Sequence, residues 1–192
     1  MVNYVELKAV NSGNQAQFGV IQNYRNRLLL KEGKSLAAGF PADASFVMDP
    51  DFPNAVALPD VLYTMGSMLV INQKVRDVLE ARAVPDIEFL PVNIVNHKGR
   101  KTKEQYVLVN MLRIVDCVDR AKTKHTLNPL APDKMVDVSD VVLDEKKIDK
   151  DTQLFRPLGL AVLMVARRDL GDHLKAAKVT GLGVGEIVEF KS

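Results

Sequence analysis

Glu104-Gln-Tyr-Val-Leu-Val-Asn-Met-Leu-Arg-Ile-Val-Asp-Cys-Val-Asp119 is the longest apolar-rich run in the chain, and it decides the fold class. Two sets of apolar side chains alternate along it with a period of two, which is the period of a strand. They are Leu108, Leu112, Ile114 and Val118 on one face, and Val107, Val109, Met111, Val115 and Cys117 on the other. We therefore predict a long strand over about 105–118 that is covered on both faces. Because this exceeds the usual strand of roughly five to six residues, we also expect a bulge or bend.

Two strand–helix units flank this run. In the first, an apolar strand over 68–71 leads to Asn72 in the N-cap position, followed by a helix that ends before Pro85. In the second, the strand over 160–165 leads to a helix with Leu170 and Leu174 on its apolar face. The two units match with a one-residue offset. Either the chain contains an internal duplication, or such units simply recur in α+β domains.

These patterns predict an α+β fold with a central, mostly antiparallel sheet and the two strand–helix units packed on it. We expect a single domain over residues 1–192. Four prolines lie between residues 39 and 59, so we predict an irregular surface loop there. Phe46, Val47 and Met48 are expected to pack this loop against the core. A last short strand is expected over 186–190, and 120–150 is expected to be a polar connection.

The composition limits the kinds of function. Hydrophobic residues make up 47% of the 192 residues and the net charge is +2, which points to neither a nucleic-acid partner nor an anionic membrane. The N-terminus has no signal-peptide pattern, and no stretch has the ~18 uninterrupted apolar residues of a membrane-spanning helix. A single cysteine, Cys117, excludes an internal disulfide and suits the cytoplasm. We expect a cytoplasmic protein without a cofactor; a homo-oligomer is possible.

Asp116 and Asp119 are the carboxylates with the clearest chemical potential. Together they could bind a divalent cation or share a proton, which would make the chain a metal-dependent enzyme or a metal-binding domain. On a regular strand, however, residues three apart face opposite ways. The alternative is that Asp119 caps a turn at the end of the strand. His97, His125 and His173 show no metal-ligand spacing, and Cys117 is expected to be a core thiol.

Five motifs resemble one bacterial family, the small α+β immunity proteins known as immunity family eleven. They are Leu58-Pro-Asp-Val-Leu62, Ile87-Glu-Phe-Leu-Pro-Val92, Tyr106-Val-Leu-Val-Asn-Met-Leu112, Val115-Asp-Cys-Val-Asp119 and Phe155-Arg156. The resemblance covers roughly residues 40–190. It implies a non-enzymatic protein of a polymorphic toxin system that binds a cognate toxin domain, expected to be a nuclease, in the cytoplasm and blocks it by occlusion.

The family carries no catalytic motif, so the resemblance assigns no catalytic or metal-binding residue. A nuclease surface would be basic, and exposed acids would complement it. On that ground the Pro-rich loop and the turn after Asp119 are candidate contacts, through Asp49, Asp51, Asp116 and Asp119. Two alternatives stay open: the metal-dependent protein using Asp116 and Asp119, and an accessory protein of a secretion apparatus.

Overall fold

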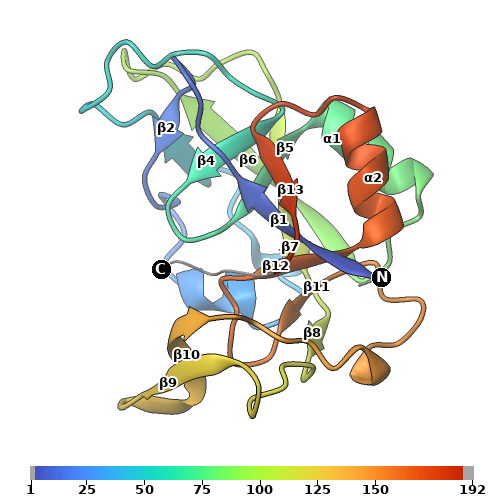
Figure 1. Cartoon of the computed structure of the whole chain (residues 1–192). Coiled ribbons are helices and arrows are strands. Elements are labelled where there is room, and N and C mark those ends of the chain that lie inside the picture. Colours follow the sequence, from blue (N-terminus) through green and yellow to red (C-terminus); the bar gives the residue numbers. More distant parts are fainter. Residues whose placement is uncertain (1–2, 188–192) are drawn as a thin grey trace.

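The computed structural model describes residues 3–187 and confirms the α+β class. Within this range the chain forms thirteen strands and two α-helices, arranged in two large sheets and a separate hairpin (Figure 1). The helices are α1 (Gln73–Ala81) and α2 (Arg168–Ala176), and they lie side by side. Three short 3₁₀ turns are η1 (Arg27–Lys31), η2 (Ala37–Gly39) and η3 (Glu145–Lys147).

The first sheet has six strands, and its interior pairs are antiparallel. In spatial order they are β2 (Gln17–Phe18), β4 (Val61–Thr64), β5 (Leu69–Asn72), β7 (Tyr106–Met111), β6 (Ile87–Val95) and β3 (Ser45–Val47). The two short edge strands, β2 and β3, pair in parallel with their neighbours. The prediction of a mostly antiparallel central sheet is therefore confirmed.

The second sheet has five strands and the same mixed character. In spatial order they are β13 (Leu182–Gly185), β1 (Tyr4–Ala9), β12 (Met164–Arg167), β11 (Leu154–Pro157) and β8 (Ile114–Val115). Only β8 pairs in parallel, with β11. Strands β9 (Lys124–Asn128) and β10 (Ala131–Ser139) form the separate hairpin, which the polar sequence of this segment had not indicated.

The apolar run that decides the fold is covered on both faces, as predicted, but it is not one strand. It ends as β7 at Met111 and resumes as β8 in the other sheet, which is the bend that its length suggested. At the crossing, the N–H of Leu112 donates to Asp86 O (2.8 Å), while the carbonyl of Arg113 accepts from the N–H of Arg156 (3.1 Å). The backbone therefore stays hydrogen-bonded while it changes sheets.

Alternate side chains of the strands enter different cores. The central core lies between the sheets and under both helices. Both sheets contribute to it, through residues such as Leu7, Ile71, Val109 and Met164, and helix α2 contributes Leu174. A second core covers the outer face of the six-stranded sheet with the segment that follows β2. A third covers the outer face of the five-stranded sheet with the segment that follows β8.

The Pro-rich segment is less irregular than expected. It contains β3, which pairs with the far end of β6. Phe46 and Met48 are buried, as predicted, but Val47 is 40% exposed because neighbouring residues of a strand point in opposite directions. Near the C-terminus, the strand predicted over 186–190 is replaced by β13 four residues earlier, and residues 188–190 lie outside the described range.

Both predicted strand–helix units are present, but the second strand is Met164–Arg167 rather than 160–165, because residues 160–163 belong to the turn before it. The two units correspond residue by residue. Residues 69–90 match 164–185 without a gap, so the offset needed from the sequence alone disappears. Both helices end through the same hydrogen bond, from the N–H of Val84 to Leu79 O (3.1 Å) and of Val179 to Leu174 O (3.4 Å). Ala83 and Lys178, the residues directly before these donors, both have positive φ. So do Asp86 and Gly181, which directly precede the next strands.

The correspondence between the two units extends to a strand that precedes each of them in the chain, β1 for the first unit and β7 for the second. Strand β7 lies between β5 and β6, and β1 lies in the same register between β12 and β13. Likewise β2 pairs in parallel with β4 as β8 does with β11. The chain thus forms two repeats, β1-β2-β4-β5-α1-β6 and β7-β8-β11-β12-α2-β13. Each repeat places its first strand in the sheet of the other.

Candidate functional site

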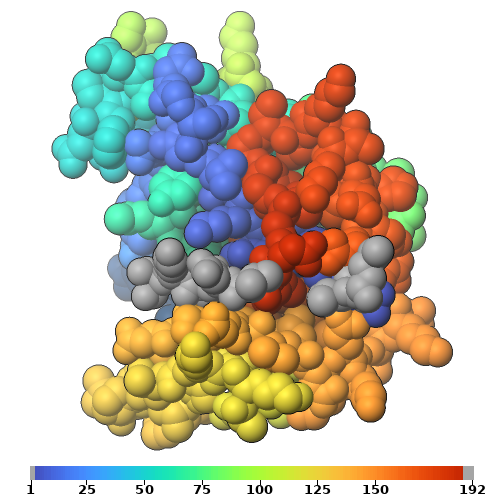
Figure 2. Space-filling model, in the orientation of Figure 1, coloured from blue at the N-terminus to red at the C-terminus, as the bar shows by residue number. Residues whose placement is uncertain are grey.

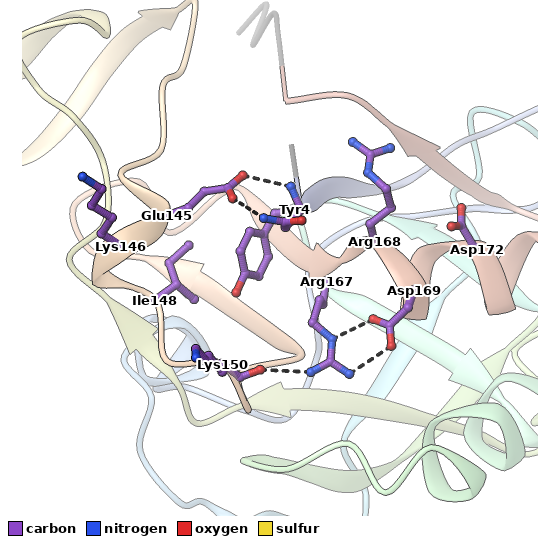
Figure 3. A pocket seen from close by; sticks show the side chains of 10 residues that line it. Tyr4, Glu145, Lys146, Ile148, Lys150, Arg167, Arg168, Asp169 and Asp172 are labelled. Carbon is purple, nitrogen blue, oxygen red and sulfur yellow. Dashed lines mark hydrogen bonds and ion pairs between the residues drawn. The ribbon is translucent and has the colours of Figure 1, made fainter. Parts of the chain in front are cut away.

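One polar hollow of about 620 Å³ lies where β1, η3 and the start of α2 meet (Figure 3). Two strand–helix junction residues, Arg167 and Asp169, form one side of it, and Glu145 and Tyr4 form the other. No sequence motif predicted these residues. The alternation of charge in Arg167-Arg168-Asp169 at a helix start was the signal available, but the partners that complete the hollow are distant in sequence.

An ion-pair network ties the charged groups on the helix side of the hollow. Arg167 donates from Nε and Nη2 to the two carboxylate oxygens of Asp169, at 2.7 and 2.9 Å. Its Nη1 donates to Lys150 O (3.0 Å), and Arg82 also pairs with Asp169. The hydrogen bonds from Arg167 lower the pKa of Asp169 to about 2. Asp169 also accepts from the N–H of Leu170 (2.9 Å), so it supports a helix start whose N-cap side chain makes no such bond.

On the other side, Glu145 holds the N-terminal strand. Its carboxylate accepts from the N–H of Asn3 (2.9 Å) and from Asn3 Nδ2 (2.7 Å). Burial, together with the nearby charge of Glu145, raises the pKa of Tyr4, so its phenol stays neutral at physiological pH. The two best-defined carboxylates of the hollow thus already accept hydrogen bonds from the protein. This arrangement fastens chain segments together and leaves a polar surface between them.

A second hollow adjoins the first along residues 140–147, and a third adjoins the second at Asp119 and Asp144. A hollow of about 780 Å³ shares Glu145 and Lys146 with it, and one of about 330 Å³ contains Asp116, Asp119 and Asp144. The structure thus brings the predicted pair, Asp116 and Asp119, to one hollow. In the described range 3–187, no group of three or more His, Cys, Asp or Glu residues has a geometry that could hold a metal ion.

Asp119 caps a turn, which was the alternative considered for it. Its Oδ1 accepts from the N–H groups of Ala121 (3.2 Å) and Lys122 (3.3 Å), and its Oδ2 pairs with Lys122 Nζ (2.8 Å). The hydrogen bond from Lys122 lowers the pKa of Asp119. Cys117, two residues earlier, is fully buried, and burial raises the pKa of its thiol to about 12, as expected for a core cysteine.

Asp49 and Asp51 lie at the other end of the molecule. Their loop projects at the upper left of Figure 1, whereas the turn after Asp119 lies in its lower part beside the β9–β10 hairpin. Asp49 accepts from the N–H of Asp51 (3.0 Å), and its own N–H donates to Gln17 O (2.9 Å). The four predicted contact residues therefore form two separate pairs. Directly after Asp51 in the first loop, Phe52 is 44% exposed, which no sequence pattern predicted.

The two helices of the described region are short, and neither has the length and apolar character needed to cross a bilayer.

Residues 3–189 match the family model described as Immunity protein family (Imm11). A comparison with curated proteins gave no match. The matched range includes both sheets, both helices and all five motifs on which the resemblance rested. Since it spans nearly all of the 192 residues, the chain belongs to the Immunity protein family (Imm11).

Proposed function

We propose that this chain is a cytoplasmic immunity protein that binds a cognate toxin domain, a nuclease, and blocks it by occlusion without catalysis of its own. The observation that carries the proposal is the family match over residues 3–189. Glu145, Asp169 and Asp119 fit this role, because their carboxylates are engaged in structural hydrogen bonds and ion pairs that hold a fixed surface. A fixed surface binds a partner with a small entropic cost of ordering.

We propose Asp49, Asp51, Asp116 and Asp119 as partner contacts. Since the two pairs lie at opposite ends, they are tested as two separate double variants, Asp49→Ala with Asp51→Ala and Asp116→Ala with Asp119→Ala. If a basic nuclease surface faces one pair, only the double variant of that pair should bind the toxin domain more weakly. Unchanged toxin affinity in both variants would remove all four residues from the interface.

Co-expression tests the function. The C-terminal domain of the large protein encoded by the neighbouring gene is expressed alone and together with this chain. Toxicity that the chain relieves, with a complex that co-purifies, is the expected result. Toxicity without relief would contradict the immunity role. Nuclease activity of the isolated domain on DNA and RNA, and its loss on adding the purified chain, identifies the target and the mode of blocking.

A further inference from the structure

Exposed apolar side chains gather on the Pro-rich loop next to one of the predicted acid pairs. Val47 is 40% exposed, Phe52 44% and Val56 54%. With Asp49 and Asp51 they make up what we call the Phe52 patch, on the teal segment that projects at the upper left of Figure 2. Exposed apolar side chains grouped in this way, with polar groups beside them, mark interaction sites on soluble proteins.

The loop that carries the patch is held in place. Its backbone forms three hydrogen bonds to two other segments, β6 and residues 14–17: Met48 N to Val95 O (2.9 Å), Asp49 N to Gln17 O (2.9 Å) and Ala57 N to Asn14 O (3.1 Å). Inside the loop, the N–H of Phe52 donates to Asp49 O (3.1 Å). Pro50 fixes φ inside this turn, and Pro53 fixes φ directly after it. Phe52 is therefore presented in a defined place, so binding would order few groups.

The charge around the patch identifies the chemistry of its partner. The 39 residues between Lys34 and Lys74 contain four aspartates and no lysine or arginine, although the whole chain has a net charge of +2. Within the described structure, neither Asp49 nor Asp51 has an ion-pair partner. The cationic turn over 96–103 reaches this loop at Ala55, whose carbonyl oxygen lies 3.3 Å from His97 Nε2. The carboxylates of Asp49 and Asp51, close to Phe52 in the sequence, are thus available to pair with a cation of a partner.

The opposite end of the molecule offers less for a basic partner. Asp119 is paired with Lys122 and Asp140 with Lys124 (2.6 Å). Leu130 at the tip of the β9–β10 hairpin is 96% exposed, but Lys124 and Lys134 lie on the strands of that hairpin. Of the two ends carrying predicted contacts, the Phe52 patch alone combines an exposed aromatic side chain with unpaired carboxylates in the described structure.

We infer that the Phe52 patch is the docking surface for the toxin domain: Phe52 enters an apolar pocket of the toxin, and a lysine or arginine of the toxin pairs with Asp49 and Asp51. This inference rests on the proposed immunity function and names its surface. Aromatic side chains are enriched at protein interfaces, and the rim around the interface core is polar.

Calorimetric titration of the full chain with the C-terminal domain of the neighbouring gene's product tests the inference. Phe52→Ala is expected to raise Kd by about 30-fold or more, as hot-spot truncation does. Asp49→Asn with Asp51→Asn is expected to slow association and to reduce its dependence on salt. Leu130→Ala is the matched control, since it truncates a more exposed apolar side chain at the other end and is expected to leave Kd unchanged.

The melting temperature of each variant separates docking from folding. Phe52→Ala is expected to melt close to the wild type, because Phe52 is 44% exposed and belongs to none of the three buried cores. If the wild type binds the toxin domain and Phe52→Ala binds equally well, the docking surface is wrong while the immunity function stands. If the wild type itself does not bind, both are overturned. If Leu130→Ala weakens binding and Phe52→Ala does not, the docking surface lies at the hairpin end.

Discussion

Arg156 shows how one residue can join two parts of the fold. Its side chain is 2% exposed, yet within residues 3–187 no carboxylate pairs with it. Instead, Nη1 donates to Ala161 O (2.5 Å) and Nη2 to Ser67 O (2.8 Å), in the turns that precede β12 and β5. Burial lowers the pKa of Arg156 to about 10, so it is still charged at pH 7. The guanidinium therefore links equivalent turns of the two repeats.

Replacing Arg156 should destabilise the protein strongly. Arg156→Ala leaves two carbonyl groups without donors and opens a cavity, so we expect a loss of roughly 2–4 kcal/mol in the free energy of unfolding. Arg156→Lys should lose less, because one donor can still reach a carbonyl. Urea denaturation measures both. Arg25→Ala, at an exposed arginine, is the control and should change stability by less than about 0.5 kcal/mol. Equal losses for Arg156→Ala and Arg25→Ala would contradict the bridging role.

Gly181 is a second residue whose identity the fold requires. Its φ of +76° is in the left-handed region, and a Cβ there would overlap the Val61 carbonyl oxygen and approach Pro59 Cβ to 2.9 Å. Gly181→Ala should therefore cost roughly 3 kcal/mol or more. Gly13 has a similar φ of +62° with nothing within 4 Å, so Gly13→Ala should cost only about 1 kcal/mol. Thermal denaturation of the two variants separates backbone conformation from crowding; equal losses would show that crowding at Gly181 is absent.

At the scale of elements, Asp60 fastens the entry of β4 to both helices. Its carboxylate accepts from the N–H of Thr180 (2.8 Å) beyond α2, and from Lys74 Nζ (2.9 Å) and Asn72 Nδ2 (2.8 Å) at the start of α1. Burial alone would raise the pKa of Asp60, but these hydrogen bonds outweigh it and hold the pKa at about 2. The carboxylate is therefore more acidic in the folded than in the unfolded chain.

This difference predicts how stability depends on pH. A carboxyl whose pKa falls on folding stabilises the protein above its unfolded pKa of 3.8, and this contribution is lost as the pH falls towards 2. The side chain is 13% exposed, so the contribution should be about 2 kcal/mol at pH 7. Asp60→Asn should be less stable by that amount at pH 7 and nearly equal to the wild type at pH 2. Urea denaturation over this range tests it; a difference that does not change with pH would contradict it.

Sequence periodicity predicted most elements but not their assembly. The alternation in β7 and the N-cap at Asn72, whose Oδ1 accepts from the N–H of Val75 (3.3 Å), are local features and could be predicted. The same alternation continues beyond Met111, where the chain changes sheets, because period two is unaffected by which strand lies alongside. Likewise, the contact of Asp60 with Thr180 joins residues 120 positions apart. Such pairings arise from tertiary packing.

For the candidate site, too, local features could be predicted from the sequence, but the positions of its parts relative to one another could not. That Asp119 could cap a turn follows from its place after a strand, and the structure shows this cap. The separation of Asp49 and Asp51 from Asp116 and Asp119 does not follow from the sequence. It results from the position of two long insertions, one after β2 and one after β8, each of which covers the outer face of a different sheet.

At the scale of the whole molecule, the exchanged first strands should make the two repeats depend on each other. Residues 1–98 contain β1 to β6 but lack β7, which lies between β5 and β6. Residues 99–192 contain β7 to β13 but lack β1, which lies between β12 and β13. Neither fragment can complete its own sheet, and the central core takes side chains from both, including Leu7 and Val109. We therefore expect the chain to fold as one unit.

Cutting the chain between Lys98 and Gly99 tests this dependence, since both residues are exposed in a turn closed by the hydrogen bond from Asn96 N to Arg100 O (2.9 Å). Each fragment alone should be unfolded or aggregated, because a sheet without an interior strand leaves backbone groups unpaired. Together they should co-purify and recover the circular dichroism of the intact chain. Fragment 10–98, which lacks β1, is the control and should fail to restore it. A cooperative thermal transition in either fragment alone would show that the repeats fold independently.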